Sequence, residues 1–335
     1  MNKIARWDAA RRADLFVETA SQRGLSATIV EKDFWVCWTL KQIFTIDALR
    51  EMLLFKGGTS LSKVFGAIER FSEDIDLAVD YRLLGFVGKR DPKAESISRT
   101  KQTKLLSEML EVCAGFIRTE FVHLLGARCR EILGNEDWDL SIDEQDAHVV
   151  RFHYPRSLES IPSYITPQVV LELGTHADFV PRESFLIRSF AAAAFTNLFE
   201  EPDVNVIALL AKRTFLEKVT ILHAEYYRDP AKPLPQRYSR HYYDVALMAT
   251  GRIKQDALAD PELLAQVVLH KTTFYPAAWA RYDLAVPGSL RILPPEHRVR
   301  VLRQDYREMA VMIFGEAPSF EHITKQLSNL EAEIN

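Results

Sequence analysis

Two neighbouring stretches of the sequence decide the fold: Leu54-Phe55-Lys56-Gly57-Gly58-Thr59-Ser60-Leu61-Ser62-Lys63 and Ser72-Glu73-Asp74-Ile75-Asp76-Leu77. The apolar run 52–55 ends abruptly at two glycines, which predicts a buried strand that enters a tight turn. We expect Thr59 or Ser60 to cap a helix after this turn, with apolar residues at helical spacing as far as Ile68. The free amides of a helix start favour a phosphate group.

A second strand is predicted from residue 74. Its period of two places Asp74 and Asp76 on one face and turns Ile75 and Leu77 toward the core. Two carboxylates beside a phosphate-binding turn suit a divalent-metal site, because magnesium takes one or two carboxylates together with substrate phosphates. Each motif alone is more typical of a capped turn or a solvated loop, but their conjunction favours a site. The pattern is not a P-loop, since no Gly-Lys-Ser/Thr is present.

The composition is that of an ordinary globular protein with room for two subdomains in 335 residues. The 46 acidic and 42 basic residues give a net charge of −4, so any contact with RNA must come from a local patch. Cys37, Cys113 and Cys129 are too few and too far apart for a disulfide framework or a zinc site, which predicts reduced thiols in the cytoplasm. The N-terminus lacks the apolar core of a signal peptide, and no apolar run approaches the ~20 residues that span a membrane.

Helices are predicted over about residues 7–20 and 26–44. The second contains Glu31-Lys32-Asp33, which by itself fits a solvated helical face. After the Asp-Ile-Asp strand comes the densest basic segment near the proposed site, followed by helix to about residue 133. Its basic residues are Lys89, Arg90, Lys93, Arg99, Lys101 and Lys104. A solvated helix start is one interpretation, and a patch for RNA phosphates is the other.

Alternating patterns over residues 138–142 and 148–152 predict a hairpin, and residues 169–174 predict a further strand. Glu172 is a lone carboxylate in that apolar run. Because a buried acid is unfavourable unless it is paired or bound to metal, either this strand has a polar face or Glu172 has a function. Residues 184–190 are compatible with one more strand, and a subdomain boundary is expected near residues 195–202.

The remainder of the chain is predicted to be mainly helical. A long amphipathic helix is expected over residues 206–227. By themselves, Glu217 and Lys218 fit surface charges, and Arg240 and Asp244 fit an (i, i+4) helical pair.

The glycine turn followed by Asp74-Ile75-Asp76 resembles the signature of the DNA-polymerase-β-type nucleotidyltransferase superfamily. With its flanking residues, Phe55 to Lys63 and Arg70 to Leu77, it resembles the AbiEii/MenT toxin branch. Two later blocks, residues 213–223 and 237–245, resemble blocks of the same toxin family. The resemblance implies an α+β fold: a polymerase-β-like nucleotidyltransferase domain over residues 1–198 and a mainly helical C-terminal domain over residues 199–335.

The resemblance also implies roles for individual residues. Asp74 and Asp76 would hold magnesium or manganese. Glu172 would be the third carboxylate, near the nucleophile, with Asp178 in reserve. The residues implied to bind the triphosphate are Gly57, Gly58, Thr59, Ser60, Lys63 and Ser72. Lys218 would neutralise phosphate charge, and Asp244 would either position that lysine or act as a base. His241 stands where many family members have an acid. A triplet similar to Glu31-Lys32-Asp33 opens many family members, which implies that it packs under the active site.

The implied reaction is metal-dependent transfer of a nucleoside monophosphate from a nucleoside triphosphate to an acceptor hydroxyl. The family further implies a cytoplasmic toxin of a type IV toxin–antitoxin or abortive-infection system, with the 3′ end of tRNA as acceptor and an antitoxin encoded nearby. Two alternatives stay open: an enzyme of the same fold that modifies a protein or a small molecule, and a non-catalytic nucleotide-binding module. Because Asp74 and Asp76 are both present, the sequence argues against the non-catalytic module.

Overall fold

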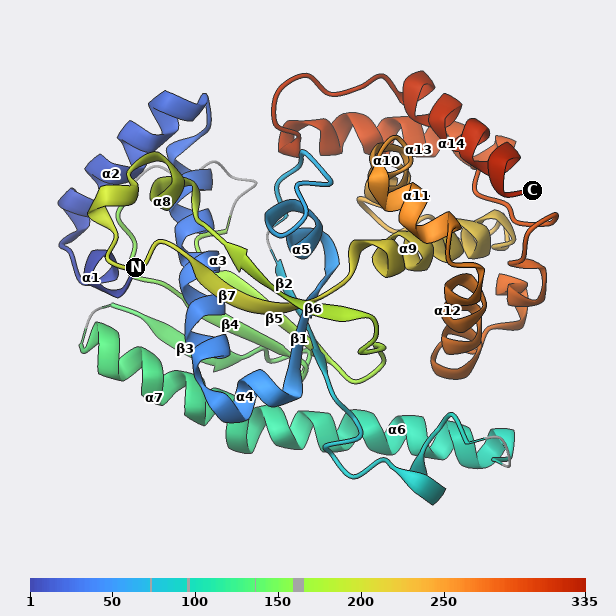
Figure 1. The fold of residues 1–335 in the computed structure, drawn as a ribbon, viewed down its shortest axis with the longest axis horizontal. Coiled ribbons are helices and arrows are strands. Elements are labelled where there is room, and N and C mark those ends of the chain that lie inside the picture. Colours follow the sequence, from blue (N-terminus) through green and yellow to red (C-terminus); the bar gives the residue numbers. More distant parts are fainter. Residues whose placement is uncertain (73, 95–96, 136, 159–165) are drawn as a thin grey trace. The chain divides into compact units, whose positions relative to one another are not determined.

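The computed structural model describes residues 1–72, 74–94, 97–135, 137–158 and 166–335, so Glu73 of the motif lies outside the described residues. By their internal contacts these residues form two units (Figure 1). The first unit comprises Met1–Val64 and Ser72–Leu209, and the second comprises Phe65–Phe71 and Leu210–Asn335. The first contains a sheet and helices and the second is mainly helical, which confirms the predicted α+β class.

The described part of the first unit contains a seven-stranded mixed sheet. Its strands lie in the order β3 (Asp139–Ile142), β4 (Val149–His153), β5 (Val169–Gly174), β2 (Asp74–Val79), β1 (Leu53–Lys56), β7 (Val204–Leu209) and β6 (Arg182–Ile187). β5 runs parallel to β2, and β7 runs parallel to β1, whereas β1 and β2 are antiparallel. The predicted strands around the two motifs, the β3–β4 hairpin and the strand that carries Glu172 are therefore confirmed.

Strand β7 corrects one prediction. Residues 206–209, expected to begin a long helix, instead pair with β1 and β6. Val204, Val206 and Ala208 are buried while Asn205 is exposed, which is the alternation of a strand. Helix α9 begins only at Ala211 (Ala211–Tyr226). The predicted domain boundary after residue 198 lies before β7, which belongs to the first unit.

One face of the sheet carries the main hydrophobic core. Helix α3 (Ala27–Thr45) lies along this face (Figure 1), where Trp35 and Trp38 pack among side chains such as Phe55, Leu77 and Phe152. Because side chains of a strand alternate, Lys56, Asp74, Asp76 and Glu172 all lie on the opposite face. The fold therefore presents the candidate carboxylates on the side of the sheet that the main core does not cover.

The remaining helices complete the two units. In the first unit they are α1 (Asn2–Ala5), α2 (Ala9–Arg23), α4 (Asp47–Met52), α5 (Gly57–Lys63), α6 (Arg99–Phe116), α7 (Val122–Leu133) and α8 (Phe190–Ala194). In the second unit they are α9, α10 (Ser239–Met248), α11 (Arg252–Leu258), α12 (Pro261–Phe274), α13 (Glu296–Met309) and α14 (Phe320–Ile334). A π-helical turn at Ile117–Phe121 joins α6 to α7. None of the described helices combines the length and apolar character that a bilayer span requires. Cys37, Cys113 and Cys129 are buried free thiols.

Candidate active site

The glycine turn passes directly into helix α5, which begins at Gly57 after Lys56. The prediction that Thr59 or Ser60 caps this helix is therefore wrong, because both lie inside it. The Thr59 hydroxyl instead donates to the backbone carbonyl of Asp74 at 2.5 Å, and the carbonyl of Ser72 lies 3.4 Å from it. Thr59 thus ties the helix that follows the turn to the start of the strand that carries the carboxylates.

Gly57 and Asp76 occupy the same small space. Gly57 has a φ of +78°, and a Cβ atom at this position would lie 1.8 Å from Oδ2 of Asp76. Only glycine accommodates both this backbone conformation and this close approach. The first glycine of the turn is consequently required by the position of the second aspartate.

Three charged side chains stand side by side across neighbouring strands. Asp76 is opposite Lys56 in β1 and opposite Glu172 in β5. The Lys56 ammonium lies 4.0 Å from Oδ1 of Asp76. Asp74 and Asp76 are half-buried and Glu172 is exposed, so β5 has a polar face at this point. The structure therefore places the three carboxylates that the sequence singled out on one face of two adjacent strands, and it adds Lys56.

The donor set fits a hard divalent cation. Among the described residues, no three His, Cys, Asp or Glu side chains are gathered closely enough to form a metal site by themselves. Magnesium needs only one or two carboxylates from a protein when substrate phosphates and water complete its octahedron. Asp74 and Asp76, on one face of one strand, meet this requirement.

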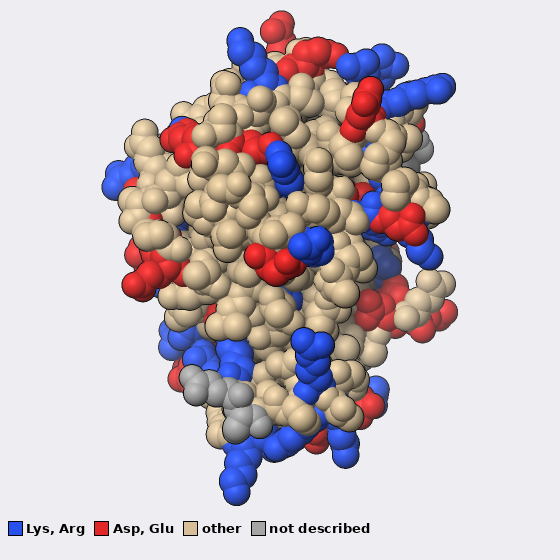
Figure 2. Space-filling model, turned by 90° about the vertical axis from the view of Figure 1, so that its right-hand side faces the viewer, with Lys and Arg blue, Asp and Glu red and all other residues tan. Residues whose placement is uncertain are grey.

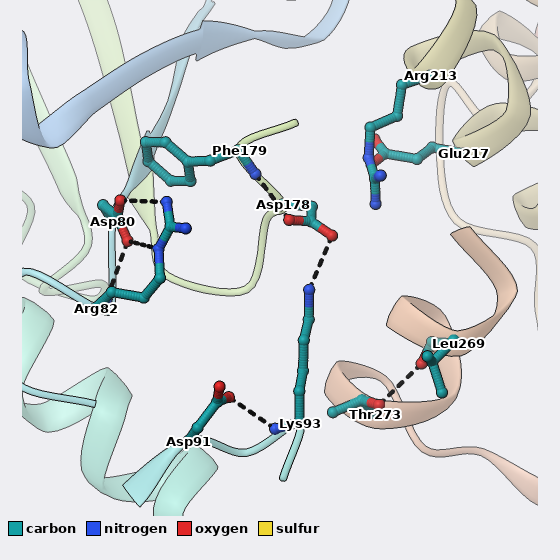
Figure 3. A network of polar contacts seen from close by, with 10 residues as sticks. All are labelled: Asp80, Arg82, Asp91, Lys93, Asp178, Phe179, Arg213, Glu217, Leu269 and Thr273. Atoms are coloured by element: carbon teal, nitrogen blue, oxygen red, sulfur yellow. Dashed lines mark hydrogen bonds and ion pairs between the residues drawn. The ribbon is translucent and has the colours of Figure 1, made fainter. Parts of the chain in front are cut away.

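Asp178, the reserve for the third carboxylate, is already engaged (Figure 3). Its Oδ2 pairs with the Lys93 ammonium at 2.9 Å, and its Oδ1 accepts a hydrogen bond from the Phe179 amide at 3.0 Å. It also lies beyond the end of β5, whereas Glu172 lies directly opposite Asp76. These contacts favour Glu172 as the third carboxylate.

The charged triplet of α3, Glu31-Lys32-Asp33, is buried, so the prediction that it forms a solvated face is wrong. Glu31 accepts a hydrogen bond from the Ser157 amide at 2.7 Å, and Lys32 donates to the carbonyl of Thr166 at 3.1 Å. Asp33 forms an ion pair with Lys63, the last residue of α5, and accepts a hydrogen bond from the Phe190 amide at 2.6 Å. The triplet therefore ties α3 to the end of α5, to the start of α8 and to residues 157 and 166.

The second unit holds a buried ion-pair cluster. Lys218 on α9 and Asp244 on α10, which the sequence paired by resemblance alone, are 3.0 Å apart (Nζ to Oδ2). Arg70 donates to both oxygens of Asp244, at 2.7 Å from Nε and 2.8 Å from Nη2. Burial alone would raise the pKa of Asp244, but the charges and hydrogen bonds of Arg70 and Lys218 outweigh it and hold this pKa well below its usual range. Asp244 is therefore a permanent carboxylate with both oxygens occupied.

Two basic groups near this carboxylate, Lys218 and His241, have lowered pKa values. Burial lowers the pKa of Lys218, while Asp244 opposes the effect. Burial, Lys218 and Arg240 together hold the pKa of His241 well below its usual range, so this imidazole is neutral at pH 7. Arg70 and Lys56 had no assigned role in the sequence. Sequence features could have identified both residues. Lys56 lies on the same face of the strand period as the candidate carboxylates, and Arg70 directly precedes Phe71-Ser72 of the motif.

The basic segment is largely exposed. Arg90 pairs with Glu108 at 2.7 Å and Lys93 with Asp178, while Lys89, Arg99, Lys101 and Lys104 are exposed at or near the start of α6. Figure 2 shows Lys and Arg side chains gathered at the lower end of the view, where Figure 1 places the start of α6. This patch lies in the same unit as Asp74 and Asp76.

The strand–glycine–helix unit, the following strand with two carboxylates and the facing acid on β5 define a nucleotidyltransferase. A family model described as the nucleotidyl transferase AbiEii toxin of a type IV toxin–antitoxin system matches residues 38–326, and the chain belongs to this family. Among solved structures the chain is similar to MenT4, a nucleotidyltransferase toxin from Mycobacterium tuberculosis H37Rv. The identity is 13%, the TM-score is 0.42, and the match covers 90% of this chain and 99% of that one. No curated protein matches the chain.

Proposed function

We propose that this toxin transfers a nucleoside monophosphate from a nucleoside triphosphate to the 3′-terminal hydroxyl of tRNA. The acceptor oxygen forms a bond to the α-phosphorus, and the bond to pyrophosphate breaks. The observation that carries the proposal is the position of Asp74 and Asp76 on the sheet face that the main core does not cover, with Asp76 against Gly57 and opposite Glu172. A cognate antitoxin is the expected protein partner, as membership of a type IV toxin–antitoxin family implies.

Each site residue is proposed to have its own role in the transfer. Asp74 and Asp76 would hold magnesium or manganese, which when bound screens phosphate charge and polarises the reacting phosphate. Glu172 accepts the proton of the acceptor hydroxyl. The triphosphate lies on the turn formed by Gly57, Gly58, Thr59 and Ser60, next to Ser72, and Lys218 neutralises its charge. Catalysis is then mainly positioning and electrostatic stabilisation.

Lys63 is proposed to contribute its charge to the same triphosphate. Its ion pair with Asp33 supports a further role, because this contact fixes the last residue of α5 against α3. Lys56, 4.0 Å from Asp76, supplies a second cation on the site face of the sheet. Lys56 offsets the charge that gathers when carboxylates and phosphates meet, whereas the Lys63 ammonium is already paired with Asp33.

The acceptor is proposed to be RNA because of the exposed basic patch. The start of α6 carries Arg99, Lys101 and Lys104 although cations oppose the dipole of a helix at its N-terminus. A polyanion that binds there would offset this unfavourable arrangement. tRNA, with phosphates available along its acceptor arm, is such a partner.

The test is incubation of the purified protein with each labelled nucleoside triphosphate, magnesium and total tRNA, beside Asp76→Ala. Glu183→Ala, which removes an exposed carboxylate from strand β6, is the matched control. Label on tRNA with wild type and Glu183→Ala, but not with Asp76→Ala, supports the proposal. Label on the protein or on a small molecule would identify that species, and not tRNA, as the acceptor. No label on any species would favour a nucleotide-binding module.

A further inference from the structure

The segment Phe65–Phe71 separates the glycine turn from the metal-binding strand, yet it belongs to the second unit. The amide of Phe71 donates to the carbonyl of Met312 at 2.7 Å, and the amide of Phe314 donates to the carbonyl of Glu69 at 2.7 Å. These bonds flank Arg70, which pairs with Ile313 as an isolated bridge. The chain therefore leaves α5, is fixed within the second unit at Arg70, and returns to the first unit at Ser72.

The Arg70 side chain is held as firmly as its backbone. It is 5% exposed, Asp244 is fully buried and Lys218 is 8% exposed. The Arg70 guanidinium occupies both oxygens of Asp244 in a fork, while Lys218 shares Oδ2. A planar fork fixes the orientation of a carboxylate in a way that a single ammonium does not. The lysine is therefore anchored to a carboxylate that has no freedom to rotate.

We infer that Arg70 is a positioning residue for nucleotidyl transfer, which makes Asp244 the fixed anchor of the Lys218 ammonium and not a proton acceptor. This inference deepens the proposed function and rests on it. The sequence left open whether Asp244 positions the lysine or acts as a base. Three of its lone pairs accept hydrogen bonds from Arg70 and Lys218, and the side chain is fully buried, so this carboxylate is committed to the two cations.

The exposure of the cluster agrees with this assignment. Arg70 and Lys218 both direct cationic groups at Asp244, so the carboxylate holds the two side chains together. Asp244 is fully buried and Arg70 is nearly so, whereas Lys218 is partly accessible and can meet an anionic ligand such as a triphosphate. Arg70 thus orients the anchor that holds the Lys218 ammonium in place.

The experiment compares Arg70→Met and Arg70→Lys with wild type. The control is Arg213→Met, which removes another buried arginine of the second unit that pairs with an acid, here Glu217 at 3.1 Å. Two quantities are measured: the affinity for a fluorescent nucleoside triphosphate with magnesium and no acceptor, and KM and kcat for transfer. Melting temperatures report the effect of each substitution on folding.

We expect Arg70→Met to weaken triphosphate affinity and raise KM by roughly 10- to 100-fold, the usual range for a group that orients a functional residue. Arg70→Lys, which keeps the charge, should fold and recover part of this loss. Arg213→Met should lower the melting temperature without a change in affinity or KM. If Arg70→Lys and Arg70→Met bind and turn over triphosphate like wild type, the inference is overturned. Wild-type protein that binds no triphosphate overturns the proposed function, and the inference with it.

Discussion

The two units use the same residue types in opposite physical settings. In the first unit, Asp74, Asp76 and Glu172 lie on the face of the sheet that the main core does not cover, and each is half-buried or exposed. In the second, Asp244 is fully buried between Arg70 and Lys218. An aspartate on this face can exchange its ligands for a metal ion and phosphates, whereas a buried one is committed to its partners. We therefore propose that the carboxylates of the first unit take part in the chemistry and that Asp244 supports it.

This difference has an energetic basis. A carboxylate at a sheet surface keeps much of its hydration, so its removal costs the fold little. A carboxylate buried between two cations has exchanged hydration for ion pairs, so its removal leaves two buried charges without compensation. The same Asp→Asn change should therefore abolish nucleotidyl transfer at Asp76 and lower the free energy of unfolding at Asp244.

The largest effect is expected for Asp76→Asn. The neutral amide is a poor ligand for magnesium, so transfer should fall by at least about 10³-fold, as on removal of a principal source of transition-state stabilisation. The melting temperature should change little, because Asp76 is only half-buried, its nearest cation is 4.0 Å away, and asparagine keeps its size. The rate is measured by transfer of label from triphosphate to tRNA and the stability by thermal unfolding. Retained transfer would remove Asp76 from the metal site.

Asp244→Asn should instead destabilise the protein by about 3 kcal/mol or more, because Arg70 and Lys218 lose the negative charge that compensates them. The measurement is unfolding by denaturant at pH 7. Asp305→Asn is the control, since this carboxylate also accepts hydrogen bonds within the second unit, from the amides of Arg237 and Ser239, but forms no ion pair with a buried cation among the described residues. Equal losses for the two variants would contradict the comparison.

The ion pairs of Asp244 also predict a dependence of stability on pH. Because its pKa in the folded protein lies below the unfolded value of about 3.9, the folded state binds this proton less readily. The stabilisation is therefore complete above that value and is lost as the pH falls through the folded pKa. The difference in unfolding free energy between wild type and Asp244→Asn should be constant from pH 7 to about pH 5 and should shrink below about pH 4. A difference that already shrinks between pH 7 and pH 5 would exclude Asp244 as its source.

Gly57→Ala tests how tightly the open site is built. The added methyl group would meet the Asp76 carboxylate and displace it, so transfer should fall by roughly 10- to 100-fold. Gly24→Ala is the control, because Gly24 also has a positive φ, +64°, but a Cβ atom there would meet nothing within 4 Å. Both changes should cost about 1–2 kcal/mol of stability through the left-handed backbone. Only Gly57→Ala should lose activity.

The sequence predicted the open site better than the buried one. The strand period alone placed Asp74 and Asp76 on one face, and the lone acid in an apolar run pointed to Glu172. These are local patterns, so local rules find them. The packing of Arg70 against Asp244 joins residues 174 positions apart, and no local rule reaches across that separation.

Two errors have the same origin. Residues 206–209 fit a helical stripe in isolation, but in the structure they form a strand because they pair with β1 and β6. Glu31-Lys32-Asp33 reads as a solvated face on a helical wheel, yet each member meets a partner from a distant segment. In both cases tertiary contacts override the local preference.

The smallest effect is expected at the basic patch. Lys101→Glu with Lys104→Glu should raise KM for tRNA several-fold and lower the slope of log affinity against log salt by about 1.4, or about 0.7 for each lost phosphate contact on a single strand. KM for triphosphate should not change. The fold should not suffer, because Ser98 already accepts a hydrogen bond from the Lys101 amide at 3.3 Å and a glutamate at residue 101 completes a capping box.

The control for the patch is Arg252→Glu with Lys325→Glu, which reverses two exposed charges of the second unit. This double variant changes the net charge equally, so it measures the effect of overall charge on RNA affinity. A loss confined to the α6 variant identifies a local phosphate contact in the unit that carries Asp74 and Asp76. Equal losses in both variants would mean that tRNA responds only to net charge, and the acceptor would then have to be recognised through the sheet face that carries these carboxylates.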